Sequence, residues 1–101
     1  MIITRWNSQR KVNQSEIEEL LRSEGLEPFL WQDGAGTYYP THSHSYEEVR
    51  WVIEGSVTFG VQGEEVILNP GDRLDLPAGT EHYAKVSDKH PTIYLCASKH
   101  T

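Results

Sequence analysis

Turn-forming residues interrupt this sequence about every five to ten residues from Glu27 onward, and the runs between them are short and rich in β-branched and aromatic residues. Such runs have the length of strands and are too short for stable isolated helices. The expected strands are 28–32, 37–44, 47–54, 56–61, 64–68, 73–76, 81–86 and 92–98. Many short strands joined by turns predict an all-β domain, a sandwich or barrel of the jelly-roll type.

The first 26 residues carry a different pattern. Residues 2–6 are apolar and β-branched, which predicts a short strand. After them, apolar residues recur at helical spacing at Ile17, Leu20 and Leu21. Ser15, with Glu18 three residues later, is typical of a capping box at a helix start. We therefore expect one short N-terminal α-helix of about nine residues.

Length and charge limit the possible partners. A chain of 101 residues has room for one compact domain, which we divide into an N-terminal strand and helix (1–26) and a core barrel at about 27–98. The net charge of −6 argues against nucleic acid or an anionic membrane and favours a small molecule. The sequence has no run of 18 apolar residues and no charged leader before an apolar core, so we expect a cytoplasmic protein. The single Cys96 excludes an internal disulfide and is expected to be packed and unreactive.

Three histidines and one glutamate have the spacing of a metal site. Residues two apart on a strand project from the same face about 6.5 Å apart, so His42 and His44 can bind one ion. Glu48 has the same parity, whereas His82 comes from a distant segment and completes the site only in a barrel-like fold. Nitrogen and carboxylate ligands without a thiolate suit Fe, Ni, Mn, Zn or Cu. We expect one divalent transition metal, with its identity open.

A His-x-His pair alone also occurs by chance, but here it is part of a longer arrangement. The sequence reads Gly-x5-His-x-His-x3-Glu-x6-Gly from Gly36 to Gly55 and Gly-x5-Pro-x-Gly-x2-His from Gly71 to His82. These stretches resemble the two signature motifs of the cupin superfamily, and the resemblance covers residues 36 to about 86. It implies a double-stranded β-helix, or jelly-roll barrel, whose interior metal is held by His42, His44, Glu48 and His82.

Arg50 lies two residues past Glu48 and is expected to point into the same barrel interior. A buried arginine is costly unless it is paired. In one interpretation it forms a structural ion pair with an acidic neighbour such as Glu54 or Asp75. In the other, its guanidinium binds the oxygen atoms of an anionic substrate beside the metal. The sequence leaves both open.

The stretch from His42 to Phe59 is similar to the corresponding stretch of the acireductone dioxygenases within the cupins. Those enzymes have His-x-His, three spacers, Glu, an Arg two residues later and an aliphatic run ending in Gly-Ser. They also have the Pro-Ala-Gly that precedes the last histidine, as at residues 77–79 here. The resemblance implies Fe(II) or Ni(II) and the O2-dependent cleavage of an ene-diol, although those enzymes are considerably longer than this chain.

Three classes of function stay open. The first is a metal-dependent dioxygenase acting on a small anionic or enediol substrate, with Arg50 stabilising negative charge. The second is a non-redox isomerase or lyase, in which the ion acts as a Lewis acid and Tyr46 or Glu47 moves protons. The third is a non-catalytic module that binds a small molecule.

The opposite face of the strand at 47–54 carries Val49, Trp51 and Ile53, which is too apolar to leave in water. We therefore expect a homodimer, in which residues 2–6 add to the sheet of the partner, as is common among cupins. The alternative is that the helix containing Ile17 covers this face within a monomer.

Overall fold

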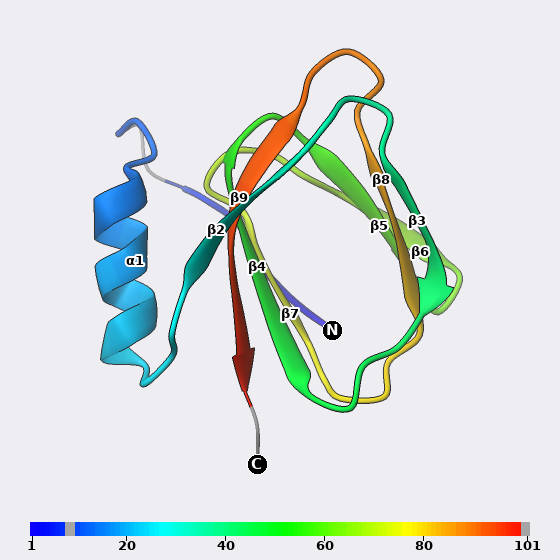
Figure 1. The fold of residues 1–101 in the computed structure, drawn as a ribbon, viewed down its shortest axis with the longest axis horizontal. Helices are drawn as coiled ribbons and strands as arrows, with labels where there is room; N and C mark the ends of the chain where they lie inside the picture. The colour runs from blue at the N-terminus through cyan, green and yellow to red at the C-terminus, as the bar shows by residue number, and fades with distance from the viewer. Residues whose placement is uncertain (8–9, 100–101) are drawn as a thin grey trace.

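The computed structural model describes residues 1–7 and 10–99 as nine strands and one helix (Figure 1). The helix is α1 (Gln14–Ser23). The strands are β1 (Ile2–Thr4), β2 (Phe29–Asp33), β3 (Tyr38–His42), β4 (Glu47–Glu54), β5 (Val57–Val61), β6 (Glu64–Leu68), β7 (Arg73–Leu76), β8 (His82–Val86) and β9 (Thr92–Lys99). Within the described ranges, α1 is not long and apolar enough to cross a membrane.

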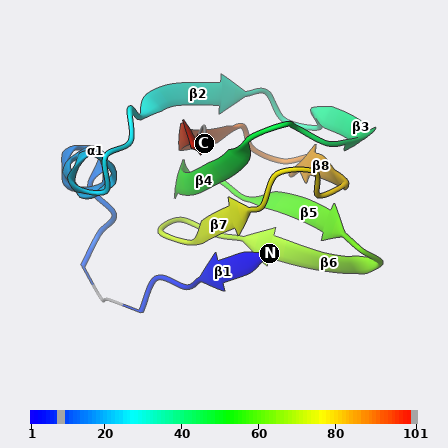
Figure 2. The same ribbon diagram turned by 90° about the horizontal axis from the view of Figure 1, so that it is seen from below.

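The strands form two antiparallel sheets that face each other across a common interior. One sheet has the order β1-β7-β4-β9-β2 and the other the order β3-β8-β5-β6. Figure 1 looks into the space that the sheets enclose, and Figure 2 shows them from below. The expected all-β jelly roll with one short helix is confirmed.

Local turn chemistry explains why the strand boundaries agree closely with the sequence pattern. Gln62 and Gly63 connect β5 to β6, and their φ angles are 52° and 83°. A two-residue loop with two positive φ angles matches the right-handed twist of the flanking strands and holds them in register. This register pairs Val61 with Glu64 and Val57 with Leu68.

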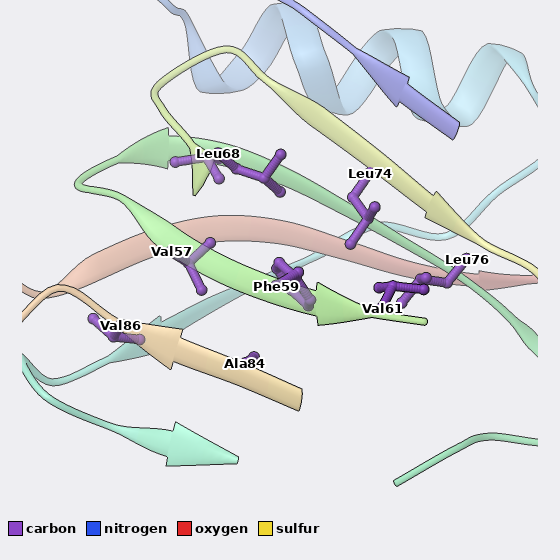
Figure 3. Close-up of a cluster of buried hydrophobic side chains, with 9 residues drawn as sticks. Val57, Phe59, Val61, Leu68, Leu74, Leu76, Ala84 and Val86 are labelled. Atoms are coloured by element: carbon purple, nitrogen blue, oxygen red, sulfur yellow. The ribbon is translucent and has the colours of Figure 1, made fainter. Parts of the chain in front are cut away.

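The apolar core fills the part of the interior between β4, β5, β6, β7 and β8. Alternate residues of these strands point inward, which is the period-two pattern of a strand with one buried face. Figure 3 shows how these side chains meet between the sheets. The cluster consists of Val52, Val57, Phe59, Val61, Leu68, Leu74, Leu76, Ala84 and Val86.

Helix α1 covers the outer face of the five-stranded sheet (Figure 1). Ile17 and Leu21 are fully buried and pack against Val49 and Trp51 of β4 and against β9. The chain runs from α1 directly into β2, which pairs with β9, so the helix lies close to this face. The helix thus covers this face within one chain, so the face does not need a partner to cover it. The homodimer itself stays a prediction.

The helix begins earlier than the sequence pattern indicated. Asn13, in an extended conformation, is the N-cap, and its side chain accepts a hydrogen bond of 3.0 Å from the backbone N–H of Glu16. The predicted capping box at Ser15 is wrong because the neighbouring asparagine, also a preferred N-cap residue, takes this role. Leu20, expected on the buried face, is 42% exposed.

Strand β1 pairs with β7 of the same chain, with Ile3 opposite Leu74. The addition of residues 2–6 to the sheet of a partner stays a prediction. Beyond β1, the ring of Trp6 packs on Gly71, where an added Cβ would lie 2.2 Å from the Trp6 Cγ atom. Gly71 also has a φ of +92°, so both the space and the backbone require glycine here.

Candidate metal centre

The pairing of β3 with β8 brings together two histidines that lie far apart in the sequence. His42 is the last residue of β3, His82 is the first of β8, and the two are directly opposite in the register. Their ring centroids are 4.4 Å apart. His82, the predicted ligand most distant in the sequence, thus lies next to His42 because β3 pairs with β8.

His44 lies in the link between β3 and β4, and Glu48 lies near the start of β4. The backbone N–H of Gly79 donates a hydrogen bond of 2.8 Å to the carbonyl of His44, which holds the link against the turn before β8. The His44 Nε2 atom is 3.0 Å from Glu48 Oε2. The glutamate is 4% exposed, so it faces the interior as its parity predicts.

The three histidines form a cluster that could hold a metal ion. One ring nitrogen from each of His42, His44 and His82 lies within 4.8 Å of the others. Glu48 Oε2 is adjacent, 4.0 Å from His82 Nε2. The structure therefore brings all four predicted ligand residues to one end of the interior.

Backbone carbonyls orient two of the rings. Nδ1 of His42 lies 2.6 Å from the carbonyl oxygen of Pro40, and Nδ1 of His82 lies 2.9 Å from that of Thr80. A carbonyl oxygen only accepts, so Nδ1 donates and Nε2 keeps a free lone pair, as metal binding requires. Burial lowers the pKa of His82, which favours the same neutral form.

Two buried polar atoms test whether this site fits a metal. His44 Nε2 and Glu48 Oε2 are buried and have no hydrogen-bond partner among the described residues, although only 3.0 Å separates them. Buried polar groups are otherwise almost always paired, because leaving them unpaired costs free energy. A proton on His44 Nε2 or one metal ion bound to both atoms would remove this cost, and only the metal ion would also use ring nitrogens of His42 and His82. The nitrogen and carboxylate donors suit a divalent transition metal and do not select which one.

Arg50 lies beside the cluster, as expected, but its partners are not the predicted ones. Its Nε donates to Glu48 Oε1, its Nη1 contacts Cys96 Sγ, and its guanidinium carbon is 5.4 Å from the ring centroid of Tyr94. Asp75 pairs with Arg73 instead, and Glu54 is exposed. Arg50 therefore does pair with an acidic neighbour, as one interpretation predicted, but that neighbour is Glu48 and not Glu54 or Asp75.

Arg50 keeps its positive charge at this position. Burial disfavours the cation, but the neighbouring Cys96, Glu48 and Tyr94 outweigh it and raise the pKa of Arg50. Burial also raises the pKa of the Cys96 thiol to about 11, so this thiol keeps its proton at neutral pH. The site thus combines a fixed cation with a buried, protonated thiol.

A cavity of about 350 Å³ adjoins the cluster. Its lining includes residues of β2 and β3, which are edge strands of the two different sheets. Besides the three histidines and Arg50, the lining is apolar or aromatic. These further residues are Phe29, Trp31, Tyr39, Phe59, Ala84 and Tyr94.

Tyr46 and Glu47, the two residues considered for proton transfer, are not among the residues that line this cavity. The ring of Tyr46 stacks on His44, with centroids 4.9 Å apart and an angle of 17° between the planes. The carboxylate of Glu47 lies 3.7 Å from the ammonium group of Lys99. Tyr46 and Glu47 are therefore placed to support the site and not to contact a ligand in the cavity.

Sequence reasoning missed the second polar group beside the cavity, which is centred on Asp33. This carboxylate is 6% exposed and accepts hydrogen bonds from the side chains of Trp31, Tyr39 and Tyr94. The available signal was the alternation of Phe29, Trp31 and Asp33 along β2, which places all three on the inward face. The tyrosines come from β3 and β9 and carried no such signal.

Comparison with known proteins agrees with this geometry. A family model described as "Cupin domain" matches residues 29–98. An acireductone dioxygenase from Bacillus licheniformis is 32% identical over 57 residues, which cover 52% of this chain and 32% of that enzyme. A quercetin 2,3-dioxygenase from Bacillus subtilis is 42% identical over 52 residues, or 50% of this chain and 15% of that enzyme.

A third relative is the dimethylsulfoniopropionate lyase DddQ from Ruegeria pomeroyi, 32% identical over 68 residues, or 66% of this chain and 34% of that enzyme. Its crystal structure has a TM-score of 0.66 and 30% identity, covering 74% of this chain and 38% of that chain. The matched segments span about a third or less of the length of all three curated relatives.

Proposed function

Since the chain belongs to the cupin family, we propose that it is a metal-dependent dioxygenase that acts on a small anionic or enediol substrate. The observation that carries this proposal is the unpaired couple of His44 Nε2 and Glu48 Oε2 inside a cluster of three histidines. Such a site favours a cation, and the adjoining cavity offers space for a substrate beside it.

His42, His44, Glu48 and His82 would hold the ion through nitrogen and carboxylate atoms. When bound, a redox-active divalent metal supplies a centre at which an electron-rich substrate and O2 react. Three neutral imidazoles and one carboxylate leave a divalent ion with net positive charge. The site therefore attracts a negatively charged substrate.

Arg50 would orient and stabilise that substrate. Its charge is fixed by its neighbours, and it lines the cavity next to the histidines. A guanidinium beside the ion strengthens the attraction for an enediolate or carboxylate, and the partly buried surroundings screen this attraction less than water would. Glu48 limits the guanidinium's movement because it accepts from Nε.

A non-redox lyase is the second candidate, because DddQ is similar over a larger share of this chain than the two dioxygenases are. A lyase needs a group that removes a proton. Tyr39 and Tyr94 line the cavity, but burial and the bond to Asp33 raise the pKa of both, so they keep their protons at neutral pH. These two tyrosines are therefore poor candidates for that base, and the lyase stays the second candidate.

Oxygen consumption tests the proposal. The Fe(II)-loaded protein is assayed with acireductones, thiols and 1,3-diketones, next to the variants His44→Ala and Arg50→Ala. We expect turnover above that of free Fe(II), its loss in His44→Ala, and weaker use of anionic substrates in Arg50→Ala. Turnover that survives in His44→Ala, or product formation without O2 uptake, would exclude the dioxygenase, and the second result would favour the lyase.

A further inference from the structure

The lining of the cavity contains two chemically different sets of side chains. The histidines and Arg50 form a polar set, and five aromatic side chains from four strands form the set that we call the aromatic half. We propose that the aromatic half is a subsite for a flat apolar group, so that the substrate carries an aromatic ring next to its metal-binding oxygens. This inference rests on the proposed function and adds a substrate class to it. The five residues are Phe29, Trp31, Tyr39, Phe59 and Tyr94.

The polar N–H and O–H groups of Trp31, Tyr39 and Tyr94 already donate to Asp33, which explains why the aromatic half selects an apolar group. Trp31 Nε1 donates to Asp33 Oδ1 over 2.9 Å, Tyr39 donates to the same oxygen over 2.5 Å, and the Tyr94 hydroxyl donates to Oδ2. Each of these side chains has a single polar proton, and Asp33 accepts all three. A polar substrate group that accepts hydrogen bonds would lose water here without gaining a donor from these rings, which is unfavourable.

Two rings of the aromatic half have exposed surface that a planar ligand would cover. Phe29 is 50% exposed and Trp31 is 48% exposed, although both line the cavity. Covering half-exposed aromatic rings with a planar group removes apolar surface from water on both partners. Ring pairs add a further preference for offset or edge-to-face contact, which an aliphatic group of similar size does not receive.

Asp33 is the positioning residue of this subsite. It touches no substrate in this scheme, but it holds the polar tips of residues from three strands, β2, β3 and β9. Their ring faces are thereby left to line the cavity. Asp33→Asn keeps the size of the side chain but removes its negative charge and replaces one acceptor oxygen with a donor, so the hydrogen bonds that hold the three rings are weakened.

A matched pair of chelators tests the subsite through direct binding. Acetohydroxamate and benzohydroxamate have the same metal-binding head and differ in a methyl against a phenyl group. Dissociation constants are measured by calorimetry on the Zn(II)-loaded protein. We expect benzohydroxamate to bind about tenfold more tightly or better, from the apolar area of one ring. The ratio should fall at least about threefold in Trp31→Ala and in Phe29→Leu.

Tyr38→Ala is the control, because Tyr38 is a 55% exposed aromatic residue that does not line the cavity. It should keep the wild-type ratio. Asp33→Asn should lower the ratio while acetohydroxamate affinity stays within about twofold. An equal loss for both chelators would limit Asp33 to support of the fold and overturn its positioning role.

Failure of the subsite is distinguishable from failure of the proposed function. If acetohydroxamate binds the Zn(II)-loaded protein but the wild-type ratio equals that of Trp31→Ala and Phe29→Leu, the subsite is wrong and the metal centre stands. If the wild-type protein retains no Zn(II), or neither chelator binds to the loaded protein, the proposed function fails and the subsite with it. The thermal unfolding temperature of each variant reports whether it is folded.

Discussion

Asp72 and Glu48 are both buried carboxylates next to an arginine, but their remaining partners differ. Asp72 accepts from Arg5 and from the backbone N–H groups of Trp6 and Asn69, at distances of 2.8 to 3.0 Å. Glu48 has one oxygen on Arg50, while the other faces His44 without a hydrogen bond. The fold supplies hydrogen-bond donors to both oxygens of Asp72, whereas Glu48 Oε2 is left as an acceptor that a cation could use. This difference is what the proposed metal site requires of Glu48, and Asp72 offers the matching structural acid.

The largest expected effect is the loss of metal binding when a ligand residue is removed. Glu48→Ala and His82→Ala each remove one donor from a four-residue set, so the affinity for Zn(II) should fall by more than about 100-fold. Asp72→Asn serves as the matched control and should keep wild-type affinity. Metal content after dialysis measures this, and equal content in all four proteins would remove the distinction between the two carboxylates.

Metal addition should stabilise the wild-type protein through the same site. At a free metal concentration of about 100 times the dissociation constant, linkage predicts about 2.7 kcal/mol. For a domain of this size, that corresponds to a rise of about 10 °C or more in the unfolding temperature. A chelator should reverse the rise, and His82→Ala should not show it. A similar rise in His82→Ala would place the bound metal elsewhere.

Removing the carboxylate of Asp72 should reduce stability without affecting metal binding. Asp72→Ala leaves two backbone N–H groups without their acceptor, so the free energy of unfolding should fall by about 2 kcal/mol. Urea unfolding of the metal-free proteins measures this difference. A loss of metal affinity in Asp72→Ala comparable to that of Glu48→Ala would contradict the separation of roles.

The smallest expected effect is the pH dependence of the Asp72 contribution. Burial disfavours its charge, but the N–H groups of Asn69 and Trp6 and the side chain of Arg5 outweigh it and lower the pKa of Asp72. Its folded pKa lies below the unfolded value of about 3.9, so the contribution is complete above about pH 5 and decreases as the pH falls through this region. The stability difference between wild type and Asp72→Asn should therefore shrink below about pH 4. A difference that stays constant down to pH 3 would contradict this assignment.

The sequence by itself determined the strands and the parity of the residues on them. The turn at Gln62 and Gly63 requires positive φ angles, and the period-two pattern orients Glu48 and Arg50 inward. Both are consequences of local backbone geometry, which depends on residues a few positions apart. The rings of His42 and His44 are close, 4.8 Å between centroids, but strand geometry is not the reason: β3 ends at His42, and His44 lies in the following link, outside the strand expected at 37–44.

Only the tertiary structure decided the contacts between distant segments. The register of β3 with β8 places His82 opposite His42, and the packing of α1 on β4 covers Trp51 within one chain. The partner of Arg50 and the group around Asp33 were likewise beyond sequence reasoning. The physical reason is that partners of buried polar groups come from whichever strands the sheets bring together, and burial of the whole barrel, rather than any local propensity, determines that arrangement.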